Sequence, residues 1–149
     1  MATNAKPANH GATVSSLAAP VSPKQPIILD LPYPPSLNHY WRRNANGGLR
    51  ISAAGKAYRQ STILEFHRVT GLYGGKGYFR EPVAVEIAVF EPKHHVADLD
   101  NLLKCLLDSM THARVYDDDK RVKYIQMAAS AGGAAPSVRV EVSAMRPIT

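Results

Sequence analysis

Residues 83–90 carry the strongest structural signal in the chain. Four β-branched aliphatic side chains alternate with four others that are small, acidic or aromatic, and Pro82 and Pro92 stand on either side. Strict alternation is typical of a strand that buries one face and exposes the other. Proline ends such a strand because it donates no backbone hydrogen bond. We therefore predict a sheet strand here, with its aliphatic face in the core.

The segment that follows changes to a helical period. Between residues 98 and 112 the large apolar side chains recur at steps of three and four, which places them on one face of a helix. They are Leu99, Leu102, Leu103, Leu106 and Met110. Strands are predicted again at 122–129 and 137–144, joined by a loop at Gly132-Gly133, and valines alternate along the second strand.

The N-terminal half predicts a strand, a hairpin and a helix. The apolar run that begins at Ile27 predicts a short strand, which prolines at 32–35 terminate. Two strand-like pieces within 40–52 flank a turn rich in Asn and Gly, which is typical of a β-hairpin. Ser52 is a candidate cap for a helix over 53–68. This element order predicts an α/β (α+β) fold, a single small domain with one mixed β-sheet and two helices.

Residues 1–26 differ in composition from the remainder of the chain. They consist mainly of Ala, Pro, Ser, Thr and Asn, and they contain no acidic and no aromatic residue. A segment of this kind buries too little apolar surface to offset the entropy of folding. We expect a disordered N-terminal leader, with a weakly basic arm that touches DNA as the alternative, and a folded domain over 27–149.

The chain is basic, which narrows the choice of partner. Eighteen Lys and Arg against twelve Asp and Glu give a net charge of +6, and such a balance suits a protein that binds polyanions. Nucleic acid is therefore the first expected partner. No apolar run approaches the roughly 18 residues that span a bilayer. The single Cys105 excludes an intramolecular disulfide and the common zinc motifs. We expect a cytoplasmic protein with no membrane segment.

Against this basic background the acidic residues cluster. Asp98 and Asp100 open the predicted helix, and three adjacent aspartates at 117–119 follow it. A helix cap, a favourable first-turn charge and a solvated turn would explain the clusters separately. Together, the carboxylates could supply the hard oxygen ligands that Mg²⁺ or Mn²⁺ prefers. A helix of fifteen residues rises about 22 Å, so the triplet reaches the first cluster only if the chain runs back along the sheet.

Lys104 lies between two acidic residues on the same predicted helix. It stands four residues after Asp100 and four before Asp108, so the three share one polar stripe. The stripe is either a salt-bridge ladder or a means of holding an ammonium group near a phosphate that is cleaved. The spacing alone favours neither interpretation.

Basic and aromatic residues interleave in two other places. They are Tyr40-Trp41-Arg42-Arg43 and the segment that holds Lys56, Tyr58 and Arg59. This mixture suits phosphate contacts combined with stacking on unpaired bases. The alternative is that the aromatic rings belong to the core, because a small domain must bury its large side chains. For Trp41 both alternatives stay open.

Taken in order, these segments resemble the RusA-type Holliday junction resolvases of bacteria and their prophages. The resemblance covers nearly all of the chain after residue 26. It rests on four segments, which are Leu31 to Arg42, Ser52 to Arg59, Asp98-Leu99-Asp100-Asn101-Leu102 with Lys104, and Asp118 to Val122. The resemblance implies a small α/β protein that forms a homodimer.

The resemblance also assigns roles to individual residues. It makes Asp98, Asp100 and Asp119 the catalytic, metal-binding carboxylates, with Asp118 as the next candidate ligand, and Lys104 an essential base or phosphate contact. The residues expected to contact DNA are Asn38, Arg42, Arg43, Lys56, Arg59 and Lys93.

The sequence therefore predicts a Mg²⁺-dependent, structure-selective endodeoxyribonuclease, with Mn²⁺ as a substitute metal. Its expected substrate is the four-way DNA junction, cut by paired phosphodiester cleavage in recombination and repair, in a bacterial or phage-infected cell. A four-way junction is close to two-fold symmetric, so a homodimer suits it. The alternative is a non-catalytic module that binds branched DNA, in which the acidic residues only cap and solvate.

Overall fold

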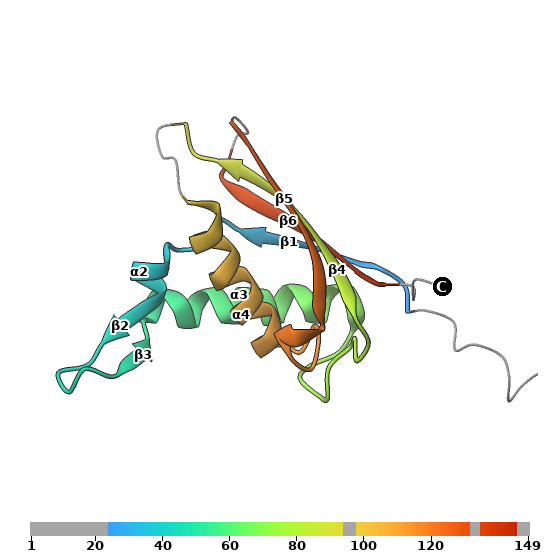
Figure 1. The fold of residues 1–149 in the computed structure, drawn as a ribbon, viewed down its shortest axis with the longest axis horizontal. Coiled ribbons are helices and arrows are strands. Elements are labelled where there is room, and N and C mark those ends of the chain that lie inside the picture. Colours follow the sequence, from blue (N-terminus) through green and yellow to red (C-terminus); the bar gives the residue numbers. More distant parts are fainter. Residues whose placement is uncertain (1–23, 94–97, 132–134, 146–149) are drawn as a thin grey trace, which may run out of the picture.

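The computed structural model describes residues 24–93, 98–131 and 135–145 (Figure 1). A four-stranded sheet carries two long helices on one face, and a small hairpin stands beside them. The elements in chain order are β1 (Ile27–Pro32), α2 (Leu37–Tyr40), β2 (Trp41–Arg43), β3 (Leu49–Ile51), α3 (Ala53–Thr70), β4 (Val83–Glu91), α4 (Leu99–Ala113), the 3-10 helix η1 (Asp119–Arg121), β5 (Val122–Ala131) and β6 (Ser137–Ala144).

The sheet is mixed, as predicted. Its strand order is β1-β6-β4-β5, in which β4 and β5 are parallel and the other two pairs are antiparallel. Parallel neighbours need a crossover connection, and α4 supplies it between β4 and β5. The helix consequently runs against the direction of both strands, so its first residue lies at the end of the sheet where β4 finishes (Figure 1).

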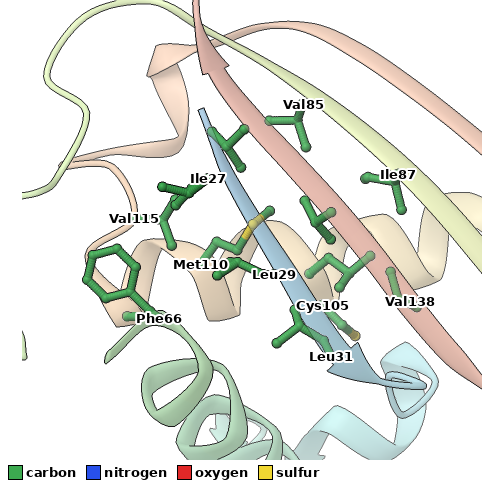
Figure 2. Packing of buried hydrophobic residues seen from close by; sticks show 14 of the residues in the cluster. Ile27, Leu29, Leu31, Phe66, Val85, Ile87, Cys105, Met110, Val115 and Val138 are labelled. Atoms are coloured by element: carbon green, nitrogen blue, oxygen red, sulfur yellow. The ribbon is translucent and has the colours of Figure 1, made fainter. Parts of the chain in front are cut away.

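The alternation in β4 forms the centre of the core. Val83, Val85, Ile87 and Val89 are all buried, together with the matching faces of β1 and β6. Figure 2 shows Cys105 and Met110 of α4 and Phe66 of α3 among the side chains that meet this face. Burial of each large aliphatic side chain contributes about 1.5–3 kcal/mol.

The structure differs from prediction around Tyr40. This residue was expected in the first strand of the hairpin, but it ends the one-turn helix α2, an element that the sequence analysis missed. The carbonyl of Ser36 accepts the backbone N–H groups of His39 and Tyr40, at 2.9 and 2.8 Å. The hairpin is correct, but β2 and β3 form a separate two-stranded sheet.

The start of α3 explains why a glycine stands in the first turn of this helix. Ser52 caps the helix as predicted, because its Oγ accepts the Gly55 N–H at 3.0 Å. A Cβ atom at Gly55 would lie 2.6 Å from the carbonyl oxygen of Tyr40 and 2.7 Å from the Ile51 side chain. Glycine is therefore required there by close approach rather than tolerated. The helix extends two residues beyond the predicted end, to Thr70, and Gly71 terminates it at φ +74°.

Strand β5 is an exposed edge of the sheet, and β1 is the edge on the opposite side. Ile125 and Met127 lie on the same face as Val85 and Ile87, with which they pair. The described helices leave this end of the face uncovered, and Ile125 is 40% exposed. The strand is also two residues longer than predicted. The predicted glycine loop that joins it to β6 lies outside the described residues.

In the described part of the chain, no helix combines the length and apolar character needed to cross a membrane. The leader predicted for residues 1–26 lies largely outside the described residues.

Candidate active site and nucleic-acid interface

Asp98 immediately precedes α4 and keeps its carboxylate available. Its backbone carbonyl accepts the N–H groups of Asn101 and Leu102, at 3.1 and 3.2 Å. Its side chain accepts no capping hydrogen bond from the helix. The interpretation of Asp98 as a side-chain cap is therefore wrong, and its exposed carboxylate makes no capping bond to the described helix.

Asp100, in the first turn of α4, forms the predicted pair with Lys104 one turn later. Lys104 Nζ lies 3.9 Å from Asp100 Oδ2, and both side chains are well exposed, at 62% and 72%. An ion pair of this kind contributes little to folding. The stripe does not continue as a ladder, because Asp108 pairs with Arg59 of α3 instead. The first two turns of α4 thus present two carboxylates and one ammonium group to solvent.

The three adjacent aspartates after α4 have different roles. Asp117 forms a bidentate ion pair with Arg121, at 2.8 and 2.9 Å, and this guanidinium lowers the pKa of Asp117. Asp118 caps η1, since its Oδ1 accepts the Lys120 N–H at 2.8 Å, and this bond lowers the pKa of Asp118. Asp119 is exposed and joins none of the ion pairs formed among the described residues. Two of the three carboxylates thus hold structural contacts, whereas the Asp119 carboxylate makes no ion pair with the described residues.

The two acidic clusters do not meet within one chain. Asp98 precedes the fifteen residues of α4, and Asp119 follows them, so about 22 Å of helix separates the two ends. Because α4 runs against β4 and β5, Asp98 lies at the finishing end of the two strands and Asp119 at their starting end (Figure 1). Among the described residues no three His, Cys, Asp or Glu side chains gather closely enough to hold a metal ion. The expected convergence of Asp98, Asp100 and Asp119 does not occur within a single chain.

A cationic pocket lies where the hairpin meets the start of α3. It has a volume of about 510 Å³, and Arg42, Arg50 and Lys56 line it with His39 and the first residues of the helix. Arg42 and Lys56 were predicted to contact DNA, whereas Arg50 was missed. Arg50 is the direct cross-strand partner of Arg42 in the hairpin. Like charges placed opposite each other destabilise a strand pair, so this arrangement favours a bound anion.

A second pocket on the hairpin holds two further predicted contacts, Asn38 and Arg43. It measures about 480 Å³ and is lined by Asn38, Trp41 and Arg43 together with Arg42 and two leucines. Trp41 is partly buried and reaches this pocket, whereas the neighbouring Tyr40 is entirely in the core. Tyr40 is therefore a core ring, whereas Trp41 packs partly against the core and also lines the pocket, so that both alternatives stay open for Trp41. Arg42 and Arg43 line the same pocket as the partly buried Trp41 ring.

Arg59 does not extend to the surface in the way that the other predicted contacts do. Its guanidinium binds Asp108 Oδ2 through Nη2 and Nε, at 2.8 and 3.0 Å, and its side chain is 19% exposed. Nε also donates to the Tyr40 hydroxyl at 2.9 Å. Burial, and then the hydrogen bond to Asp108, raise the pKa of Tyr40 to about 12. Lys93, in contrast, is exposed just beyond β4.

Basic residues also surround the start of β5. A pocket of about 400 Å³ is lined by Lys120, Arg121 and Lys123 together with Asp118 and Pro82. These three cations were not predicted as contacts. Their closeness in sequence to the candidate metal ligand Asp119 is the feature from which a phosphate contact could have been predicted.

Comparison with known proteins identifies the family. The family model described as Endodeoxyribonuclease RusA matches residues 32–143. The "Crossover junction endodeoxyribonuclease rusA" of Enterobacteria phage HK97 is 37% identical over 97 residues, which cover 65% of this chain and 77% of that protein. The protein of the same name from Shigella sonnei is 34% identical over 108 residues, covering 70% and 86%. That of Enterobacteria phage 82 is 35% identical over 108 residues, with the same coverage.

The matched region extends from the end of β1 into β6, and so contains the hairpin, α4 and the acidic residues on both sides of that helix. The chain therefore belongs to the Endodeoxyribonuclease RusA family.

Proposed function

We propose that this protein is a metal-dependent endodeoxyribonuclease that resolves four-way DNA junctions in recombination and repair. The observation that carries the proposal is the exposed first part of α4, where Asp98, Asp100 and Lys104 project with no structural role that accounts for both carboxylates. Family membership and the names of the relatives support the same activity. DNA as substrate, and relatives from phages and enterobacteria, favour the cytoplasm of a bacterial or phage-infected cell.

The donor set fits a hard divalent cation. Asp98, Asp100 and Asp119 offer carboxylate oxygens, which Mg²⁺ and Mn²⁺ prefer. Asp98 accepts no capping bond, and Asp119 joins no ion pair in the described part of the chain. We propose Mg²⁺ as the metal and Mn²⁺ as a substitute. When bound, the metal would activate a water molecule and polarise the phosphate. The Lys104 ammonium group would stabilise the negative charge that develops on that phosphate.

The separation of the carboxylates implies a site shared between two copies of the chain. Strand β5 is an exposed edge, and two such edges can pair antiparallel about a two-fold axis. In that arrangement the start of one β5 lies beside the finish of the other. Asp98 and Asp100 lie at the finishing end of β4 and β5, and Asp119 lies at the starting end. The pairing therefore brings the partner's Asp119 toward Asp98 and Asp100.

A dimer of this kind also suits the substrate. It contains two equivalent sites related by a two-fold axis, as two symmetric nicks in a four-way junction require. Each site would receive a DNA strand held by Arg42 and Arg43 of the hairpin of its own chain, together with Lys56 of α3 and Asn38 of α2. Lys93, near the acidic end of α4, would supply a further phosphate contact.

The test is cleavage of a synthetic four-way junction by the purified protein with Mg²⁺, with Mn²⁺ and with a chelator. We expect paired nicks that require the metal. Asp98→Asn, Asp100→Asn and Asp119→Asn should each abolish nicking, while junction affinity stays equal or rises because repulsion between carboxylate and phosphate is relieved. Asp117→Asn is the matched control and should cut. Tight junction binding without nicking by the parental protein would instead support the non-catalytic module.

A further inference from the structure

We propose that Arg59 and Asp108 are positioning residues, and that their ion pair with the Tyr40 hydroxyl holds the DNA-binding hairpin at a fixed place relative to the catalytic end of α4. The proposal rests on the proposed function for the identity of the substrate. It replaces the prediction that Arg59 contacts DNA.

The ion pair is part of a hydrogen-bonded network that joins three helices. Arg59 of α3 donates to Asp108 of α4 at 2.8 Å and to the hydroxyl of Tyr40 of α2 at 2.9 Å. The Tyr40 hydroxyl in turn donates to Asp108 Oδ2 and lies 3.2 Å from the Ser109 hydroxyl. Tyr40 is fully buried. The network thus lies at the point where α2, α3 and α4 meet.

Both ends of the hairpin are tied to this network. Tyr40 is the residue before β2, and its carbonyl accepts the N–H and the hydroxyl of Ser52, which follows β3, both at 2.9 Å. The Arg59 guanidinium also lies 5.7 Å from the Tyr40 ring and 5.6 Å from the Trp41 ring. The strands β2 and β3 form their own sheet. Because an isolated two-stranded hairpin is marginally stable, its orientation depends on these anchoring contacts.

The other side of the network belongs to the helix with the candidate active site. Asp108 lies two four-residue steps after Asp100, with Lys104 between them. A rigid helix places Asp108 about 12 Å along its axis from Asp100. The network therefore sets the distance from the cationic pocket of Arg42, Arg50 and Lys56 to the first turn of α4. A DNA backbone seated in that pocket would be presented to Asp98 and Asp100 in one register.

The contacts of Arg59 argue against a direct phosphate contact. A phosphate would have to displace a carboxylate that already holds two guanidinium nitrogens, at 2.8 and 3.0 Å. The side chain is mostly buried, whereas Arg42 and Lys56 are exposed. If Arg59 were a phosphate contact restrained by Asp108, removal of the Asp108 charge would strengthen DNA binding. If Arg59 is a positioning residue, the same change would impair cleavage.

The experiment compares Asp108→Asn, Arg59→Gln and the double variant with the parental protein. We expect a single-turnover cleavage rate at saturating enzyme about tenfold lower in each, since misplacement of reacting groups by a fraction of an ångström to an ångström has effects of that order or larger. Junction Kd and its salt dependence should change less than about threefold, because no phosphate contact is lost. The double variant should be no worse than either single one.

Asp30→Asn is the matched control. It breaks a similar ion pair, with Arg139 at 2.8 Å, on the face of the sheet away from the helices, and the cleavage rate should not change. A weaker Kd and a smaller salt slope for Arg59→Gln, together with tighter binding by Asp108→Asn, would overturn the proposal and restore Arg59 as a DNA contact.

A second measurement does not depend on cleavage. Spin labels at Ala45→Cys in the hairpin turn and at His112→Cys near the end of α4 report the distance between hairpin and helix. An excess of unlabelled chain ensures that both labels of a measured pair belong to the same chain. Both sites are exposed and the native Cys105 is buried. We expect a narrow distance distribution in the parental protein and a broad one in Asp108→Asn. Equal widths would overturn the proposal, whereas absence of nicking by the parental protein would overturn only the proposed function.

Discussion

Mixing two inactive variants tests whether the active site is shared between chains. If Asp98 of one chain works with the partner's Asp119, a heterodimer of Asp98→Asn and Asp119→Asn chains has unequal sites. One site carries both substitutions and the other carries neither. Each homodimer, in contrast, has one substitution in both of its sites. Activity should therefore return when the two inactive proteins are mixed and allowed to exchange chains.

The size of the recovery follows from this arrangement. Random exchange of equal amounts makes about half of the dimers heterodimers, and one site in each is intact, so about a quarter of all sites should cut. The fifteen residues of α4 between the two carboxylate clusters are the structural basis for expecting complementation. A heterodimer with one working site should nick one strand and leave the junction unresolved. A denaturing gel, which scores nicks, and a native gel, which scores resolved duplexes, separate these two products.

The control mixes Asp98→Asn with Asp100→Asn, whose residues lie at the same end of α4. Both substitutions then fall in the set supplied by a single chain, and every site of every dimer is defective. We expect no recovery. Nicking restored by this control mixture, or no nicking by the Asp98→Asn and Asp119→Asn mixture once heterodimers have formed, would refute a site shared in the proposed way.

Three further predictions concern the hairpin, Gly55 and the acidic triplet. Arg42→Ala and Arg50→Ala should each lower the slope of log Kd against log salt by about one, as expected for loss of one phosphate contact, whereas Glu86→Ala on the sheet should not. Gly55→Ala should lower the free energy of unfolding by about 1–3 kcal/mol in urea titrations. Alanine favours helices, but its Cβ would lie 2.6 Å from the Tyr40 carbonyl oxygen. An unchanged free energy of unfolding would mean that this contact relaxes freely. Arg121 lowers the pKa of Asp117 below its ordinary value. The ion pair therefore stabilises the fold above the pKa of Asp117 in the unfolded chain, and this contribution disappears as pH falls through the lower pKa of the folded state. Asp117→Asn should therefore lose less stability than the parental protein between pH 7 and pH 3, and equal losses would contradict the assignment.

The elements that depend on local pattern were predictable from the sequence. The alternating valines of β4 and β6 and the leucine face of α4 are periodic, and each occurs within two residues of its predicted limits. The Ser52 cap was predictable for the same reason, since cap chemistry is local. Helix α2 was missed because one turn of helix leaves too short a pattern to detect. The need for glycine at position 55 was not predictable, because the carbonyl of Tyr40 that excludes a Cβ atom belongs to a different element.

For the candidate site, the sequence names residues but does not place them relative to one another. The sequence separates Asp98 and Asp100 from Asp119 by a helix, and the pattern alone does not say whether the chain returns to close that distance. Arg59 shows the same limit. Its place in a basic and aromatic segment predicted a DNA contact, but its partner Asp108 is 49 residues away in sequence. Such long-range pairings become visible only once the helices are placed against each other.

The proposed dimer would account for both the exposed edge of β5 and the separated carboxylates. Proteins generally protect long strand edges with prolines, bulges or charged side chains, because an open edge pairs with other chains. Over ten residues β5 has no proline and a single charged side chain, Lys123, and its last four residues are small. An edge of this kind is a liability in a monomer but a pairing surface in a dimer. Antiparallel pairing would cover this edge and continue the uncovered face at Ile125 and Met127 into the partner's sheet. It would also bring Asp119 of each chain to the start of α4 in the other chain. Lys123→Pro would block that pairing, and we expect it to yield a monomer that retains the fold and does not cut.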